Sequence, residues 1–295
     1  LGPIFGAIQG ALFGPIAFVW IVLGTIFAGG VHDFLTGHIS IKHKGESIPE
    51  LVGYYLGKHT RILVFILFLI FLTLSGSAFT TASANLLTSI TGIPIIILII
   101  IMFVYYLLAT LLSIDKIIGR IYPIFGIILI IMAAGIFISL LYNGYQIPEI
   151  NLNILNMNIS PYSIFPYLFV TIACGAISGG HSTQTPLAVR CIEKETDMRL
   201  VFYGAMVAEG ILALIWAAAA MAFIHGQPDV GMFFYQNPTI AVNNISTVLL
   251  GSIGGLLAII GVVICPITTS DTLFRSMRLN IADYFNIKQD KISSR

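Results

Sequence analysis

Polar residues that could hold a small substrate gather in one otherwise apolar stretch, Thr171–Pro186, with the sequence TIACGAISGGHSTQTP. Glycines lower helix stability, and hydroxyl or amide side chains can satisfy the backbone groups that a helix break frees. In hydrocarbon such a break is tolerated only where the backbone is buried in protein or lines a wet cavity. Transporters hold substrates and ions at breaks of this kind. We therefore expect substrate-binding residues here, namely Gly175, Ser178, Gly179, His181, Ser182 and Thr183.

A second interpretation of this stretch is that the helix simply ends at Gly175 and a cytoplasmic loop begins. The apolar part, Ile164–Gly175, is shorter than the ~20 residues that a membrane span needs. This shortness favours an interrupted helix over a complete one.

Glu209 is a carboxylate well inside the apolar segment Val201–Ile224. At 1.5 Å per residue it lies ~13 Å into a hydrocarbon core that is ~30 Å thick. A carboxylate at that depth is costly unless it is neutral, paired or hydrated, so a functional role is the default and proton carriage suits it. The alternative is a protonated Glu209 that joins two helices by a hydrogen bond.

A second group of oxygen-bearing side chains follows Pro266, in the sequence CPITTSDT of Cys265–Thr272. Hard cations prefer oxygen ligands, so Thr268, Thr269 and Asp271 could hold Na⁺ where the last span ends. The other interpretation is an ordinary interfacial helix end, with Asp271 paired to Arg275 four residues later. The residues alone leave both open.

His32 and Asp33 lie together near the inner end of the apolar segment Ile16–Ile39. Histidine changes charge near neutral pH, so Asp33 and its neighbour could relay protons. The other interpretation, which the position favours, is that they sit at the headgroup boundary without any such role.

Glycines recur every fourth residue near the start of the chain, at Gly2, Gly6, Gly10 and Gly14. On a helix this spacing forms a smooth ridge on which a second helix packs closely. Close packing is one interpretation. The other is that the ridge borders the binding site, with Gly6 and Gln9 as substrate contacts.

The composition places these residues in a lipid bilayer. The chain of 295 residues is 57% hydrophobic and 9% charged, whereas a soluble domain carries about a quarter charged residues. We expect an all-α polytopic membrane protein, forming one transmembrane domain over residues 1–295 with about seven spans and an N-terminal half-helix. The net charge of +1 points away from nucleic acid, and the three cysteines have no metal-ligand spacing. We expect no cofactor and no metal.

Basic residues predict the orientation. All 14 Lys and Arg residues lie in alternate connecting segments, namely Lys42–Arg61, Lys116–Arg120, Arg190–Arg199 and Arg275–Arg295. The intervening loops, Tyr142–Ser163 and His225–Asn244, contain none. Because basic loops stay on the cytoplasmic side, we expect the N-terminus outside and the C-terminus in the cytoplasm.

Catalytic motifs are missing from the sequence. It contains no H-E-x-x-H, no G-x-S-x-G and no phosphate-binding glycine loop, so we expect no enzyme and no catalytic residue. One alternative is an intramembrane hydrolase that uses Ser178 with His181. Another is a membrane sensor or scaffold that transports nothing.

Several stretches together resemble the carbon starvation protein CstA family. They are GAIQGALFG at Gly6–Gly14, FAGGVHDF at Phe27–Phe34, CGAISGGHSTQTP at Cys174–Pro186, ETDMRLVFYGAMVAEG at Glu195–Gly210 and PITTSDTLFRSMRLNIADYF at Pro266–Phe285. The family pattern extends beyond both ends of this chain, so we expect a piece of a longer protein.

The resemblance implies an inner-membrane transporter that takes up peptides or pyruvate when carbon is scarce, coupled to H⁺ or Na⁺. It also implies the inverted-repeat fold of the amino acid–polyamine–organocation superfamily, with a broken first and sixth core helix. On that basis Gly2–Gly14 would belong to the first core helix and Gly175–Pro186 to the sixth. Glu209 would lie on the seventh, and Thr268 and Thr269 would lie on the eighth, which helps to hold a cation.

Overall fold

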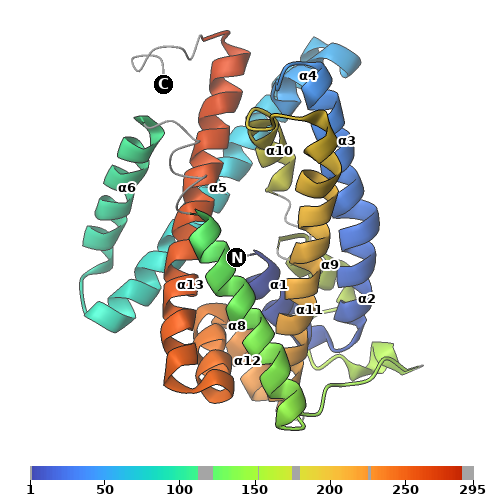
Figure 1. The fold of residues 1–295 in the computed structure, drawn as a ribbon, viewed down its shortest axis with the longest axis vertical. Helices are drawn as coiled ribbons and strands as arrows, with labels where there is room; N and C mark the ends of the chain where they lie inside the picture. The colour runs from blue at the N-terminus through green and yellow to red at the C-terminus, as the bar shows by residue number, and fades with distance from the viewer. Residues whose placement is uncertain (1, 112–121, 152, 175–179, 225–226, 288–295) are drawn as a thin grey trace. The chain divides into compact units, whose positions relative to one another are not determined.

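The computed structural model describes residues 2–111, 122–151, 153–174, 180–224 and 227–287, and the regular structure in these ranges is entirely helical. The chain forms two compact units (Figure 1). The first contains residues 1–31, 125–179 and 203–262, and the second contains residues 32–124, 180–202 and 263–295. The all-α prediction is confirmed.

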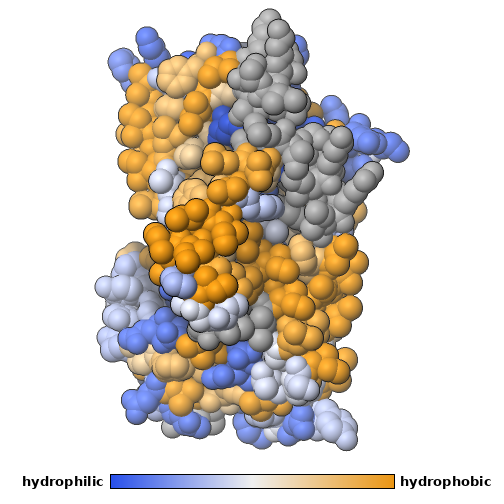
Figure 2. All heavy atoms as spheres, turned by 90° about the vertical axis from the view of Figure 1, so that its left-hand side faces the viewer, coloured by the Kyte–Doolittle hydropathy of each residue, from blue (hydrophilic) through white to orange (hydrophobic). Residues whose placement is uncertain are grey.

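Helices long and apolar enough to cross a membrane account for much of the chain. Among the described residues these are Ile16–Lys42, Lys58–Thr88, Pro123–Tyr142, Glu195–Ile224 and Pro238–Ala258, and the shorter apolar helices are Gly2–Phe13 and Ile95–Ala109. Large apolar side chains such as Ile100 and Ile130 are more than half exposed, and broad apolar areas cover the face in Figure 2. Such surfaces suit lipid rather than water, so the chain is a multi-pass membrane protein.

The first unit contains α1, a 3₁₀ turn η1, α2 and a π-helix η2, followed by α8, η3, α9, α11, α12 and the start of α13. Their bounds are Gly2–Gly10, Ala11–Phe13, Ile16–Leu23, Gly24–Gly29, Tyr122–Tyr142, Ile154–Met157, Ile164–Cys174, Ala205–Ile224, Pro228–Gln236 and Pro238–Tyr284. Helix α1 packs against α9 and α11, and it buries Ile4, Ala7 and Ile8. Gly2, Gly6 and Gly10 therefore belong to a helix that packs against others, whereas Gly14 lies beyond that helix.

Gly14 lets the chain turn between η1 and α2. Its φ of +77° and ψ of −164° define a conformation that is open almost only to glycine. A Cβ at this position would lie 2.7 Å from the carbonyl oxygen of Met157. Both the backbone conformation and the available space therefore require glycine.

The second unit contains most of α3, then α4, α5, α6, α10, η4, the start of the π-helix η5 and the second part of α13. The bounds of these helices are Gly30–Lys42, Ile48–Leu56, Lys58–Thr91, Ile95–Leu111, His181–Val189, Glu195–Asp197 and Arg199–Gly204. Helix α5 packs against α4 and α6. A Cβ at Gly76 would lie 2.7 Å from the ring of Phe274, so α5 and α13 approach closely at that point.

Polar contacts join the connecting segments of the second unit beyond its spans. Arg190 contacts both carboxylate oxygens of Asp283, at 3.0 and 2.9 Å, and donates to the carbonyl of Gly45. Arg61 lies 2.6 Å from Glu50. Burial raises the pKa of the Glu50 carboxyl above its usual value, although Arg61 acts in the opposite direction.

Two connecting segments predicted as loops contain helix. Helix α4 lies within Lys42–Arg61, and α12 and the first turns of α13 lie within His225–Asn244. These predictions were wrong because both pieces are short. A helix of nine residues, the length of α4 and of α12, is marginal by itself and depends on tertiary packing.

The last helix does not end near Pro266, as the sequence suggested. Helix α13 is interrupted at Gly251, with φ 69° and ψ −158°, and then continues through Pro266 to Tyr284. Pro266 cannot donate to the carbonyl four residues earlier. Ser83 of α5 donates to the neighbouring carbonyl of Val263 at 3.1 Å, and such side-chain donors are what make proline tolerable in membrane helices.

We expect Gly14→Ala to lower the thermal midpoint of the purified protein. The backbone strain alone costs about 1–3 kcal/mol, and the contact with Met157 adds to it. Gly126→Ala on α8 is the matched control, because a Cβ there meets nothing within 4 Å. The midpoint is measured by size-exclusion chromatography of heated, detergent-solubilised protein. A Gly14→Ala midpoint equal to that of the parent would contradict this account of the turn.

Candidate functional site

A buried carboxylate between two histidines is the clearest chemical feature of the second unit. Asp33 lies on α3 and is 4% exposed. Its Oδ2 is 2.8 Å from Nδ1 of His181, the first residue of α10. Its Oδ1 is 2.9 Å from Nδ1 of the adjacent His32. Each carboxylate oxygen therefore faces one imidazole nitrogen.

This arrangement can take up and release a proton. An ionised carboxylate only accepts hydrogen bonds, so in each contact the imidazole Nδ1 carries the hydrogen. Histidine titrates near neutral pH. The side chain of His32 is 45% exposed and that of His181 is 21% exposed. The cluster thus connects a more exposed imidazole to a more enclosed one through the carboxylate.

The burial of Asp33 bears on the two interpretations of the His32–Asp33 pair. Asp33 is enclosed and contacts a residue 148 positions later, but enclosure inside the protein does not fix its depth in the membrane. The proton relay and the headgroup-boundary position both stay predictions.

Helix α10 places the other predicted residues of the Gly-rich stretch. Ser182 and Thr183 lie in its first turn and Pro186 lies inside it. Helix α9 ends at Cys174 and α10 begins at His181, so the stretch predicted as a break is helical from His181 onward. The hydroxyls explain this difference. Thr183 donates to the carbonyl of Gly180 and Thr185 donates to that of His181, both at 2.8 Å, and these bonds support the turn before proline. Gly175, Ser178 and Gly179 lie outside the described residues.

Gly6 and Gln9 lie on α1 in the first unit. Gly6 is buried, and the side-chain amide of Gln9 donates to the carbonyl of Tyr235 on α12 at 3.0 Å. These contacts show a packing role for the ridge. A role in substrate binding stays a prediction.

Glu209 lies on α11 of the same unit and is partly buried. The next residue, Gly210, lies so close to the π-helix η2 that a Cβ there would be 2.7 Å from the Thr25 side chain. The hydroxyl of Thr25 is buried and has no hydrogen-bond partner among the described residues. Helix α11 therefore meets η2 closely at Gly210, the residue after Glu209. A role of Glu209 in proton coupling stays a prediction.

Asp271 forms a buried ion pair with Arg275. The two side chains are 1% and 0% exposed, and Nε of Arg275 lies 2.9 Å from Oδ2 of Asp271. Arg275 also donates to the carbonyl of Ala109 on α6. The pairing that the sequence offered as an alternative is present, but it lies inside a continuing helix rather than at an interfacial end. Its positive partner makes Asp271 a poorer ligand for a cation.

Thr268 and Thr269 each donate a hydroxyl hydrogen to the carbonyl of Cys265, at 2.9 and 2.8 Å. Both hydroxyl oxygens keep lone pairs. A sodium site at these two residues stays a prediction.

One polar pair escaped the sequence analysis. Gln184 on α10 donates to the hydroxyl of Thr272 on α13 at 3.1 Å. The residues are 88 positions apart, and no spacing rule connects them. The polar character of Gln184 within the Gly-rich stretch was the only available signal.

Comparison with known proteins identifies the family. The family described as carbon starvation protein CstA matches residues 1–149 and, in a second overlapping match, residues 97–248. Together the two matches cover well over half of the chain. The chain belongs to the CstA family.

Relatives of this CstA-family chain include proteins named as transporters. An uncharacterized membrane protein of Haemophilus influenzae is 37% identical over 289 residues, which cover 80% of this chain and 75% of that protein. The peptide transporter CstA of Campylobacter jejuni is 27% identical, over 82% of this chain and 43% of its own length. The pyruvate/proton symporter BtsT of Escherichia coli is 37% identical over 97 residues, 32% of this chain and 12% of that protein. The match thus spans less than half of either named transporter.

The family resemblance and the geometry meet at one place in this CstA-family chain. Asp33 comes from the motif Phe27–Phe34, and His181 comes from the motif Cys174–Pro186. The structure joins these two motifs by the 2.8 Å contact. Two of the stretches that carry the resemblance therefore build one cluster.

We expect Asp271→Asn to destabilise the protein strongly, because it leaves the charge of Arg275 buried without a counter-charge. Breaking a buried pair from one side costs about 3–5 kcal/mol. Arg190→Met is the control, since it removes a pair with Asp283 whose side chains are 33% and 17% exposed. A pair as exposed as this is worth about 1 kcal/mol or less.

Thermal midpoints in detergent provide the measurement. The double replacement Asp271→Leu with Arg275→Met should recover part of the loss, because paired removal leaves no isolated charge. A single Asp271→Asn variant as stable as Arg190→Met would show that the ion pair matters little.

Proposed function

We propose that this chain forms part of a secondary active transporter that takes up a peptide or a small carboxylate such as pyruvate, coupled to protons. The observation that carries the proposal is the buried Asp33, whose two oxygens each lie within 2.9 Å of an imidazole nitrogen. The printed names of the Campylobacter and Escherichia relatives support transport, and the second of them supports proton coupling.

Charge explains how such a cluster could couple a proton to movement. With both imidazoles neutral, the cluster of His32, Asp33 and His181 carries one negative charge, and one added proton makes it neutral. A net charge enclosed in a membrane protein costs several kcal/mol. Proton loading therefore favours states in which the cluster is enclosed, and proton release favours states in which water reaches it.

The position of His181 supports a link to substrate. It opens α10 directly after the Gly-rich stretch in which we place the substrate contacts. Protonation at His181 would change the interaction between α3 and α10, and thereby the helix that follows those contacts. The proposal assigns substrate binding to this stretch together with Gly6 and Gln9.

Further parts of the proposal rest on the sequence. They are the inverted-repeat fold, about seven spans, an outside N-terminus, a cytoplasmic C-terminus, an inner-membrane location and a role in carbon starvation. The basic residues support the orientation, because in the topology predicted from the sequence they all fall in alternate connecting segments, although Arg275 lies buried inside α13 in the structure.

We expect Asp33→Asn to abolish proton-driven accumulation, with at least a tenfold loss, while substrate exchange without a gradient continues. The carboxamide keeps the size of Asp33 but cannot carry the charge. His32→Gln is the control, because its side chain is the more exposed of the two histidines, and we expect a smaller loss. The assay measures labelled pyruvate and a labelled dipeptide entering proteoliposomes that contain the full-length protein, with and without a proton gradient.

Full accumulation by Asp33→Asn would reduce the cluster to a structural role. Glu209→Gln in the same assay tests the other candidate carrier. If Glu209→Gln loses proton-driven accumulation and Asp33→Asn keeps it, Glu209 on α11 is the proton-coupling residue instead of Asp33.

A sodium requirement is tested by replacing Thr268 and Thr269 with Val. If a sodium site exists there, the variant should need at least tenfold more Na⁺ for half-maximal uptake. Uptake by the parent that is indifferent to Na⁺ would remove this part of the proposal and leave protons as the coupling ion.

The same proteoliposomes separate transport from the two rival functions. An intramembrane hydrolase predicts cleavage of a substrate that Ser178→Ala stops, without solute accumulation. A sensor or scaffold predicts neither cleavage nor accumulation.

A further inference from the structure

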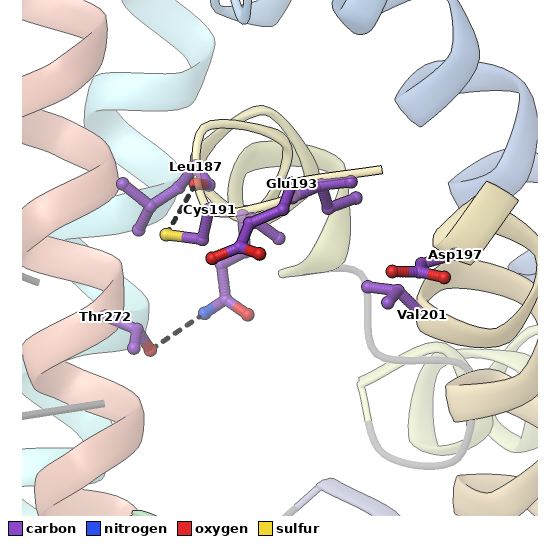
Figure 3. Close-up of a pocket in the computed structure, with 9 residues that line it drawn as sticks. Leu187, Cys191, Glu193, Asp197, Val201 and Thr272 are labelled. Atoms are coloured by element: carbon purple, nitrogen blue, oxygen red, sulfur yellow. Dashed lines mark hydrogen bonds between the residues drawn. The ribbon is translucent and has the colours of Figure 1, made fainter. Parts of the chain in front are cut away.

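A pocket of about 470 Å³ opens in the second unit beside the carboxyl end of α10 (Figure 3). One part of its lining is apolar and comes from Leu187, Ala188, Ile192 and Val201. Ligand sites typically measure ~300–1,000 Å³ and are mostly apolar with a few polar groups. The pocket has the size and character of a site for a small amphipathic molecule.

The polar part of the lining is acidic. Glu193 and Asp197 come from the segment between α10 and η5, and both residues are exposed. Figure 3 shows the Glu193 carboxylate on the same side as Cys191, with Asp197 across from it. The described lining contains no Lys or Arg, so its charge favours a cation.

A neutral polar pair completes the wall. The amide nitrogen of Gln184 donates to Thr272 at 3.1 Å, which holds α10 against α13 at the pocket. The amide oxygen and the hydroxyl keep lone pairs that can accept hydrogen bonds. An ammonium group has three hydrogens to donate and needs acceptors of this kind.

We propose that this pocket binds the amino-terminal end of a short peptide whose first side chain is apolar. The ammonium group would face Glu193 and Asp197, and the side chain would contact the apolar wall. The inference rests on the proposed transport function and selects its substrate class. A small anion such as pyruvate has no ammonium group and is repelled by the two carboxylates. Gln184 lies one helical turn after His181, so the pocket continues along α10 from the proton cluster.

Cys191 supplies a direct probe of occupancy, because this exposed residue lines the pocket. In the full-length protein with every other cysteine replaced by Ser, the rate of maleimide labelling reports access to Cys191. We expect leucyl-alanine to slow labelling about fivefold or more at saturation. N-acetyl-leucyl-alanine, which lacks the ammonium group, and pyruvate should leave the rate unchanged.

Variants identify the carboxylates. Glu193→Gln with Asp197→Asn should weaken protection by leucyl-alanine about fivefold, the combined effect expected of two exposed charge pairs. Glu195→Gln is the matched control, because it removes a carboxylate from the same segment outside the described lining. Protection should survive that change.

Equal protection by the acetylated peptide, or no protection by leucyl-alanine, would overturn the inference. Uptake is measured in parallel. Peptide uptake without protection of Cys191 would contradict peptide binding in this pocket but would be consistent with the proposed transport. Protection of Cys191 without any uptake would contradict transport but would be consistent with a peptide-binding pocket. If the cysteine replacements prevent folding, the cysteine-containing protein is heated with each compound. Only the free-amine peptide should then raise the thermal midpoint, and only when Glu193 and Asp197 are present.

Discussion

Hydrocarbon offers no hydrogen bonds, so each polar group that enters the membrane must find its partner inside the protein. The second unit of this chain meets that constraint with long-range contacts. Arg275 is fully buried, and it donates hydrogen bonds to Asp271 and to the carbonyl of Ala109 on α6. Asp33 is buried between two imidazoles. The first contact is a buried ion pair between two side chains of one helix, and the second joins a carboxylate to two imidazoles. The same constraint therefore accounts for a stabilising ion pair at Asp271 and Arg275 and for a candidate proton carrier at Asp33.

Breaks in the helices follow the same rule. Pro266 removes a backbone donor from α13, and Ser83 of α5 donates to a carbonyl beside the gap. The threonines of α10 bond carbonyls in the turn before Pro186. At Pro266 a side chain supplies a donor near the missing backbone N–H, whereas in α10 the threonine hydroxyls add to the backbone bonds of the turn. Both helices continue through their prolines. At Gly14 the chain turns outright, because the residue can adopt a conformation closed to other residues.

Membership of the CstA family gives these features a functional setting. The motif that holds Asp33 and the motif that holds His181 both resemble stretches of the family, and the fold brings them into contact. Helix α10 then connects three features along its length. It begins with the proton cluster at His181, continues with the Gln184 contact to α13, and ends beside a pocket with an acidic lining. The proposed coupling of protonation to substrate would run along this helix.

The sequence alone determined the membrane character, the all-helical class, the family and most span positions. These properties are local, because each span must be apolar over its own length and must satisfy its own backbone. It offered the Asp271–Arg275 pair as one of two alternatives, since residues four apart meet on one helix, and the structure contains that pair. Tertiary structure decided the contact between Asp33 and His181, the Gln184–Thr272 bond and the short helices α4 and α12. Partners 148 and 88 positions apart meet only through packing, and helices of nine residues form only where neighbours stabilise them. The local sequence of a segment does not show which distant residues will pack against it.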